Sequence, residues 1–167
     1  MALNSYCKLP RPTLLVLAAW LCLPSLFAQS SGYLTVGEPQ KAVGKRNAVV
    51  EVKIPVAVKE GYHVNSNKPT SDYLIPLKLT WTSTGALEGG EIVYPKPLLE
   101  KFEFSDKPDV PLSVFMGKFD LTAKFKVGAN APAGPGVASG KLRYQACSNK
   151  ACYPPKTVDV EVSYQVQ

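Results

Sequence analysis

Apolar and polar residues alternate along most of the chain, which is the pattern of β-strands that bury one face. The clearest example runs from Ala48 to Val58, where every even position is apolar and several odd positions are charged. Two more stretches, 119–127 and 158–166, repeat this alternation. The pattern predicts three long, half-buried strands. Pro55 falls on the outward face of the first, which favours a sheet edge or a bulge at that point.

The other segments carry shorter runs of the same kind, separated by turns that contain Gly and Pro. We expect strands over 75–81, over 92–94 and over the stretch that ends at Cys147, with a short edge strand within 33–36. No stretch shows helical periodicity. Roughly seven to nine short strands with turns between them predict one all-β domain, an immunoglobulin-like antiparallel β-sandwich.

The N-terminus has the three-part layout of a secretory signal peptide. Lys8 and Arg11 precede an apolar run over 14–23, and small or polar residues follow it. The run is too short to span a bilayer as a permanent helix, and no second apolar run follows, so stable membrane insertion is not expected. We assign residues 1–29 to a signal peptide and residues 30–167 to the sandwich domain.

Two of the four cysteines, Cys7 and Cys22, lie within the expected signal peptide. Cys22 follows a bulky leucine where a lipoprotein signal requires a small residue, so lipidation is disfavoured. The mature chain keeps Cys147 and Cys152. An exported protein, periplasmic or secreted, meets an oxidising compartment, so we expect this pair to rest as a disulfide.

The net charge says less about function than the cysteines do. Loss of the signal peptide lowers the formal net charge from +6 to +4, because 17 basic and 13 acidic side chains remain. No dense run of Lys and Arg is interleaved with aromatic residues, so a nucleic-acid partner is not expected.

The surviving cysteines flank a strand-to-strand connection, with Ser, Asn, Lys and Ala between them. Closing a loop of roughly six residues contributes only about 2 kcal/mol in the chain-entropy model. A domain of this size does not need such a bridge to fold, and a weakly stabilising bridge can open and close in service. Spacing alone leaves a structural staple and a redox pair equally open.

Other chemistry finds little support. Two cysteines and the single His63 are too few ligands for a closed zinc site, so no metal and no cofactor are expected. No nucleophile-elbow sequence stands beside His63, which argues against Ser/His/Asp hydrolysis. A lone histidine of this kind is more often a surface or loop contact. Phe102 and Phe104 flank Glu103 and are expected to point inward.

The segments Tyr144-Gln145-Ala146-Cys147 and Cys152-Tyr153-Pro154-Pro155 resemble the active-site motif of the N-terminal domain of the periplasmic thiol:disulfide interchange protein DsbD. Related segments are found upstream at 61–64, 94–97 and 114–117, so the resemblance covers essentially the mature chain. It implies an immunoglobulin-like sandwich whose cysteine pair passes electrons to periplasmic partners with thioredoxin-like folds. A redox role for the pair is thereby favoured.

The resemblance also implies roles for neighbouring side chains. Phe115 with Met116 would be the cap loop that covers the idle pair, and Tyr144 and Tyr153 would form walls of the site. From the residues alone, Phe115 and Met116 equally suit a filling of one end of the sandwich. The two tyrosines equally suit cross-strand packing.

The chemistry implied is thiol–disulfide exchange through a mixed disulfide, in which Cys152 makes the intermolecular bond and Cys147 resolves it. A sandwich loop lacks the helix N-terminus that lowers the thiol pKa in thioredoxins, so activation must come from neighbours such as Lys150 or from the partner. The best-known members place acidic residues before the cap aromatic, whereas this chain has Ser113 and Val114. Acidic control of the thiol pKa therefore does not carry over.

Three functions follow as hypotheses. The first is a monomeric, exported component of a protein-disulfide reductase, which serves thioredoxin-fold partners and takes electrons from a separate membrane donor, since the sequence ends at Gln167 without one. The second is a secreted binding or adhesion sandwich with an inert staple. The third is a delivery or assembly factor for cytochrome c or metal maturation, whose reduced dithiol binds a client.

Overall fold

The computed structural model describes residues 29–30, 32–103 and 109–167. The expected signal peptide up to residue 28 and Phe104 lie outside the described residues. All regular structure within the described ranges is β-strand. The strands are β1 (Gln29–Ser30), β2 (Leu34–Val36), β3 (Ala42–Gly44), β4 (Val49–Val58), β5 (His63–Asn65), β6 (Lys78–Ser83), β7 (Leu87–Val93), β8 (Leu98–Glu100), β9 (Leu112–Phe115), β10 (Lys118–Val127), β11 (Gly134–Tyr144), β12 (Ala146–Cys147) and β13 (Lys156–Val166).

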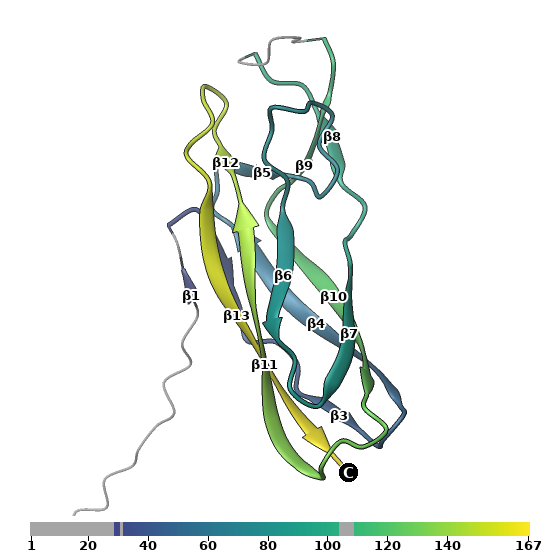
Figure 1. Ribbon diagram of the computed structural model, residues 1–167. Coiled ribbons are helices and arrows are strands. Elements are labelled where there is room, and N and C mark those ends of the chain that lie inside the picture. The colour runs from purple at the N-terminus through teal and green to yellow at the C-terminus, as the bar shows by residue number, and fades with distance from the viewer. Residues whose placement is uncertain (1–28, 31, 104–108) are drawn as a thin grey trace, which may run out of the picture.

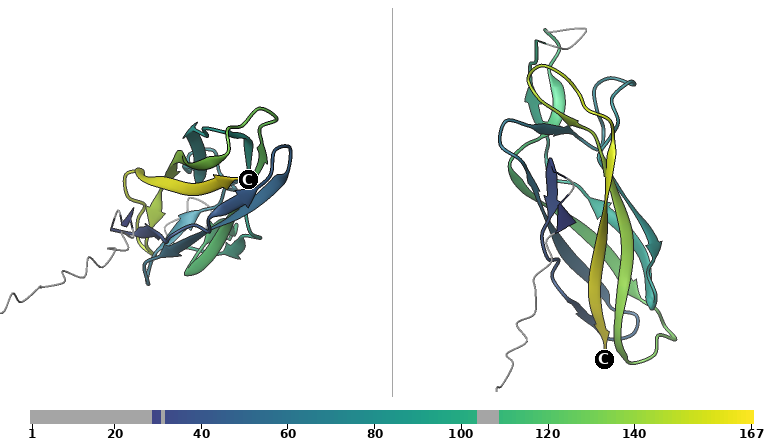
Figure 2. Two further views of the ribbon diagram at one scale, coloured as in Figure 1. Left: turned by 90° about the horizontal axis from the view of Figure 1, so that it is seen from below. Right: turned by 90° about the vertical axis from the view of Figure 1, so that its left-hand side faces the viewer.

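Two large sheets pack face to face, and a small sheet closes one end of the sandwich (Figure 1). The large sheets have the strand orders β1-β2-β4-β10-β7 and β3-β13-β11-β6, and the small sheet has the order β12-β5-β9-β8. The molecule is elongated, and the small sheet lies at the end opposite the C-terminus (Figure 2). Every strand pair is antiparallel except β3 with β13, which is parallel.

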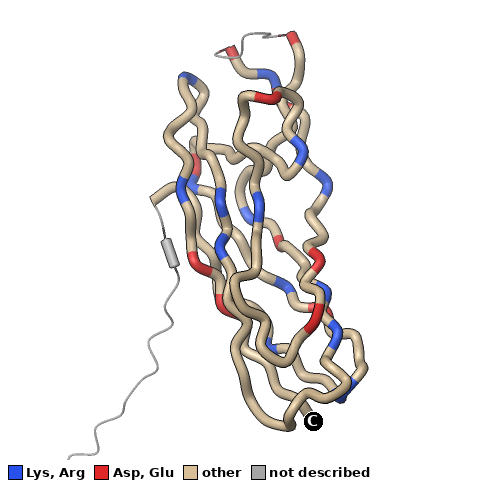
Figure 3. The backbone as a smooth tube through the Cα atoms, viewed as in Figure 1, with Lys and Arg blue, Asp and Glu red and all other residues tan. Residues whose placement is uncertain are grey.

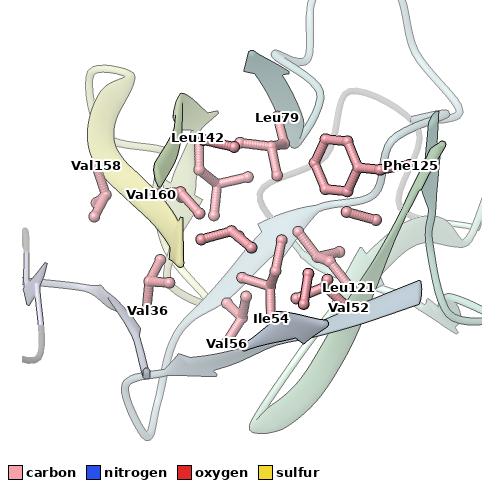
Figure 4. Packing of buried hydrophobic residues seen from close by; sticks show 14 of the residues in the cluster. Val36, Val52, Ile54, Val56, Leu79, Leu121, Phe125, Leu142, Val158 and Val160 are labelled. Carbon is pink, nitrogen blue, oxygen red and sulfur yellow. The ribbon is translucent and has the colours of Figure 1, made fainter. Parts of the chain in front are cut away.

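The core lies between the two large sheets and is built from the alternating apolar positions of their strands (Figure 4). On β4 the residues Val52, Ile54 and Val56 are buried, whereas Glu51 and Lys53 between them are exposed. Each such side chain contributes about 1.5–3 kcal/mol when it leaves water. The alternation seen in the sequence is therefore the main source of stability of the sandwich.

The three long strands predicted from the sequence are confirmed as β4, β10 and β13, and the all-β sandwich is confirmed with them. The edge position inferred from Pro55 is wrong, because β4 lies between β2 and β10. Pro55 is tolerated because β2 pairs only as far as Val56. Beyond that point the Pro55 carbonyl accepts the Gly37 N–H at 2.8 Å, so the missing proline N–H interrupts no pair with β2.

The strand expected over 75–81 starts only at Lys78. The backbone N–H of Ile75 instead donates to the side-chain oxygen of Gln145, and its carbonyl accepts from the amide of Asn65, both at 3.1 Å. Pro76 then offers no N–H for a ladder. Ile75 is thus tied to the site end of the molecule and not to a sheet.

Lys and Arg are spread over the length of the described chain, with Asp and Glu among them (Figure 3). Two exposed ion pairs, Lys124–Glu51 and Lys141–Asp159, bridge neighbouring strands at 3.0 and 2.7 Å. Exposed pairs of this kind are worth little in stability. None of the described residues forms a helix that is long and apolar enough to cross a bilayer.

Candidate redox-active site

Cys147 and Cys152 form a disulfide at the mouth of a tight hairpin. Cys147 ends β12 and faces Cys152 directly, with 3.9 Å between their Cα atoms. The N–H of Tyr153 donates to the carbonyl of Ala146 at 2.9 Å, which continues the hairpin below the bridge. The intramolecular disulfide expected from the sequence is therefore present between these two cysteines.

The tip of the hairpin is organised by Ser148. Its N–H donates to the carbonyl of Ala151 at 2.9 Å, and its hydroxyl accepts the N–H groups of Lys150 and Ala151, each at 3.3 Å. This is how a serine stabilises a turn that needs no glycine. Lys150, expected as an activating neighbour, is exposed at this tip.

The two sulfur-bearing residues differ in exposure. Cys147 is fully buried, at 0% exposed, whereas Cys152 is partly exposed. Cys152 packs against a small hydrophobic cluster that is separate from the main core. The buried members of this site cluster are Leu74, Phe102, Leu112 and Val114. Cys152 is therefore the more accessible residue of the pair, and Cys147 is shielded.

His63 lies directly opposite Cys147 in the pairing of β5 with β12. It is only 1% exposed, and its ring stacks on Phe102 with 4.0 Å between ring centroids and 20° between planes. Burial lowers the pKa of His63 to about 4, because a charged imidazolium would lose its hydration. The expectation that His63 makes a surface or loop contact is wrong, because both faces of β5 are covered.

Buried polar side chains hold β5 in place. The Asn65 amide donates to the side-chain oxygen of Gln145 at 3.1 Å, and so connects β5 to the residue between β11 and β12. On the other side, the Ser113 hydroxyl donates to that of Ser66 at 2.8 Å. Hydrogen bonds between such side chains restrict the geometry of the segments that they join. Here they fix the strand that faces Cys147.

Phe115 and Met116 do not share one environment. Phe115 pairs with Val64, so its side chain lies on the face of the small sheet that joins the main core, and it stacks on Phe119 at 4.9 Å. Successive residues of a strand point to opposite faces, so Val64 and Phe115 face away from His63 and Cys147. Met116 is 40% exposed at the rim. A cap role for these two residues stays a prediction. Among the described residues, Phe102 packs in the same cluster as Cys152.

The two expected wall residues are also separated. Tyr144 is fully buried in the main core, whereas Tyr153 is partly exposed beside Cys152. Tyr153 stacks on Tyr33 with 4.9 Å between centroids and lies 5.9 Å from the ring of Tyr62. We call Tyr33, Tyr62 and Tyr153 the tyrosine cluster. Tyr33 and Tyr62 pack against the main core, whereas Cys152 packs against the separate site cluster.

Two lysines extend this surface. The Lys156 ammonium lies 5.0 Å from the ring centre of Tyr33, and the Lys59 ammonium lies 5.7 Å from that of Tyr62. Cations at such distances are attracted to the ring faces. The phenol of Tyr153, together with burial, raises the pKa of Tyr62, which favours the neutral form of the Tyr62 phenol. The border of the site is therefore aromatic and basic.

On the other side of the hairpin lies a cavity of about 500 Å³. Its lining comes from the segment around Phe102, from Met116 and from the hairpin tip, namely Glu100, Lys101, Phe102, Glu103, Met116 and Asn149. Met116 and Asn149 of the hairpin tip thus line the same cavity. Within the described ranges, no three His, Cys, Asp or Glu side chains gather as metal ligands would.

Sequence reasoning found the cysteines but missed His63 and Phe102 as parts of the site. Phe102 was expected to point inward, and it does, at 8% exposed. Its contact with His63 joins segments that are 39 residues apart, and no sequence motif predicts this contact. The available signal was the position of His63 within the segment 61–64 that carries the family resemblance.

The comparisons with known proteins agree with this geometry. A family model described as thiol:disulfide interchange protein DsbD, N-terminal, matches residues 35–163. Among curated protein sequences, none matches this chain.

Solved structures add the fold. The N-terminal periplasmic domain of ScsB from Proteus mirabilis has 14% sequence identity and a TM-score of 0.53, over 87% of this chain and 52% of that one. This chain therefore spans about half the length of that domain. The reduced DsbD N-terminal domain of Neisseria meningitidis has 21% identity and a TM-score of 0.44, over 86% of this chain and 91% of that one. The family match covers most of the sequence and includes both cysteines. This chain therefore belongs to the family of DsbD N-terminal domains, and it has the immunoglobulin-like fold.

Proposed function

We propose that this protein is an exported electron-transfer module that exchanges disulfides with thioredoxin-fold proteins through Cys147 and Cys152. The observation that carries the proposal is the unequal exposure of the bridge, with Cys147 fully buried and Cys152 partly exposed. A purely structural staple requires no such difference. An exchange reaction does, because the partner must reach one sulfur and leave the other free to act within the chain.

The reaction starts when a thiolate of a reduced donor attacks the sulfur of Cys152. A new S–S bond forms between donor and Cys152, and the electron pair of the broken bond leaves on the sulfur of Cys147. A second donor thiolate then attacks the mixed disulfide and releases Cys152. The donor is oxidised to a disulfide, and the module holds two electrons and, after protonation, two thiols. Reduction of the next protein follows the reverse steps, with Cys152 attacking and Cys147 resolving.

The surroundings of Cys152 suit a protein partner better than a small thiol. The tyrosine cluster includes Tyr153, the residue that follows Cys152, and tyrosine is enriched at protein interfaces because it combines a large apolar face with a hydroxyl. On the opposite side, Met116 and Asn149 border the cavity beside the hairpin. A thioredoxin-fold partner would contact both sides as its active cysteine approaches Cys152.

The proposal includes the cellular setting. Residues 1–29 act as a signal peptide, and residues 30–167 work as a monomeric domain in the periplasm or outside the cell. Electrons reach the domain from a separate membrane donor, and the domain acts as one component of a protein-disulfide reductase. Cytochrome c maturation is one process that would use this reductant.

A single-turnover reaction tests the proposal. The partner is a thioredoxin-fold protein with one active-site cysteine, activated as a mixed disulfide with thionitrobenzoate, whose release is followed by absorbance. Cys147→Ser should attack through Cys152, release thionitrobenzoate and form a stable covalent adduct. The matched variant Cys152→Ser keeps only the shielded thiol, and we expect it to react at least about 100-fold more slowly.

The adduct is identified by mass on non-reducing gels. If both single-cysteine variants react alike, unequal exposure does not direct the reaction. If neither reacts, and the oxidised protein also resists a reduced thioredoxin-fold donor, the bridge is an inert staple and the alternative of a secreted binding sandwich stands.

A further inference from the structure

We propose that His63 handles the charge and the proton of the Cys147 sulfur each time the bridge opens or closes. The inference deepens the proposed function and rests on it only for the identity of the donor. The chemistry at Cys147 is the same for any reductant, which allows the two proposals to be tested apart.

The geometry places the imidazole beside the sulfur. His63 and Cys147 are direct partners across the β5–β12 ladder. Side chains at directly opposite positions of an antiparallel pair share one face, with Cβ atoms about 4.5–5.5 Å apart. The imidazole cannot swing away freely, because its ring stacks on Phe102 at 4.0 Å. Both members of the pair are buried, so bulk water does not solvate the sulfur.

The shielded position creates a chemical need. When a thiolate attacks Cys152, the electron pair of the broken bond remains on the sulfur of Cys147, and a buried anion is strongly disfavoured unless it is paired. A neutral imidazole offers one N–H donor and one nitrogen acceptor. His63 can therefore donate its N–H to the thiolate, take up a proton from solvent on its other nitrogen, and pass a proton to the sulfur. In the reverse direction His63 accepts the proton that Cys147 loses as it attacks the mixed disulfide.

The resting state of His63 fits this role. In the oxidised protein burial keeps the imidazole neutral at neutral pH, with a pKa of about 4. A negative charge that appears on the neighbouring sulfur raises the pKa of the imidazole, because an opposite charge favours the cationic form. The histidine is thus uncharged while no thiolate is present and takes up a proton when one forms.

Among the residues that the structure describes, the other charges near this pair are exposed and therefore screened by solvent. The β9 strand Leu112–Phe115 and the β12 strand Ala146–Cys147 carry no charged residue. The exposed groups on the adjoining segments are Lys59 and Glu60 before β5, Glu100, Lys101 and Glu103 around Phe102, and Lys150 at the hairpin tip. His63 is the buried titratable group that pairs with Cys147 across the ladder.

The first experiment measures the pKa of the Cys147 thiol by thiolate absorbance in Cys152→Ser, alone and combined with His63→Phe or His63→Gln. We expect His63→Phe to raise this pKa by about one unit or more, since it fills the same space without an N–H. His63→Gln retains an N–H donor and should recover part of the shift. Circular dichroism and melting temperature show which variants are folded. If the phenylalanine variant does not fold, the glutamine variant still tests the inference.

The second experiment uses the fact that the chain has one histidine. In Cys152→Ser, the imidazole ¹⁵N shifts should move at low pH and again at the pH where the Cys147 thiolate forms. In the matched variant Cys147→Ser the second step should be absent. The inference would be overturned if the thiol pKa of Cys147 were the same with and without His63. It would also be overturned if the imidazole shifts did not change as Cys147 titrates.

The kinetic experiment separates this inference from the proposed function. Reduction of the intact bridge by dithiothreitol should slow about threefold in His63→Phe, because exchange rates change by only about half a decade for each unit of thiol pKa. If a thioredoxin-fold donor fails while the dithiothreitol rates and thiol pKa values behave as expected, the proposed partner is wrong and the role of His63 stands. If the donor reacts well with every variant, the role of His63 fails and the proposed function stands.

Discussion

His63 shows how much one buried side chain can determine. It lies between the site cluster and the disulfide, in contact with Phe102 and opposite Cys147. The fold holds it as a neutral base, although an exposed imidazole would be about half charged near pH 6.5. Keeping it neutral has a consequence for stability that is separate from its role in exchange.

Stability should fall in mild acid because of this residue. The folded pKa of His63 is about 4 and its ordinary value is 6.5, so the unfolded chain binds more protons between these pH values. The free energy of unfolding should therefore drop as the pH falls from about 6.5 to about 4, by up to about 3 kcal/mol. Urea unfolding of the oxidised protein at pH 7 and pH 4 measures the difference. His63→Gln carries the same carboxylates, and an equal drop in that variant would contradict the assignment.

Residues of the site could be predicted from the sequence only in part. Cys147 and Cys152 were found because their spacing and the flanking alternation define a hairpin. His63 was misjudged because β5 is buried on both faces, with Val64 toward the main core and His63 toward the site cluster. A strand covered on both sides shows no alternation, so periodicity carries no information about it.

At the level of elements, the small sheet joins segments that are distant in the chain. Strand β5 lies between β12 and β9, and thereby brings the cysteine hairpin next to the segment of Phe115. The long strands were predictable because each carries its own repeating pattern. The small sheet was not, because its strands have two to four residues and depend on pairing with one another.

The two phenylalanines near the site should behave differently when they are truncated. Cys152 packs on the cluster that contains Phe102, so Phe102→Ala should open the bridge to solvent. We expect reduction by a small thiol to become roughly tenfold faster in that variant. Phe115→Ala should instead lose core packing, about 3–5 kcal/mol in unfolding free energy, with a smaller change in this rate.

Dithiothreitol reduction rates and urea unfolding of both variants measure these effects. The opposite ranking of the reduction rates would identify Phe115 as the residue that covers the pair, as the family resemblance implies. Equal acceleration in both variants would mean that the two ends of the small sheet open together.

For the whole molecule, the site is separate from the main source of stability. The main core lies between the two large sheets (Figure 4). Cys152 packs instead on the separate site cluster, which has four buried members among the described residues. The overall architecture could be predicted because the alternation of apolar and polar residues indicates strands that are buried between two large sheets. Its arrangement of three sheets could not, since register and order depend on contacts between distant segments.

Removing the bridge should therefore leave the sandwich intact. For Cys147→Ala with Cys152→Ala we expect an unfolding free energy lower by about 2 kcal/mol, the value for a loop of this size, with cooperative unfolding retained. Ile54→Ala in the main core is the comparison, with an expected loss of about 2–5 kcal/mol. Calorimetry and urea titration measure both. A double variant that no longer unfolds cooperatively would instead show that the fold requires the bridge.

The hairpin closes its bridge across neighbouring strands, with only five residues of sequence separation. Oxidation therefore restricts a very small part of the unfolded chain. As a consequence, the bridge adds little to the stability of the oxidised form over that of the reduced form. A substitution around the hairpin that shifts the midpoint potential by about 30 mV must change this difference by about 1.4 kcal/mol, so redox tuning and the relative thermal robustness of the two forms are linked traits.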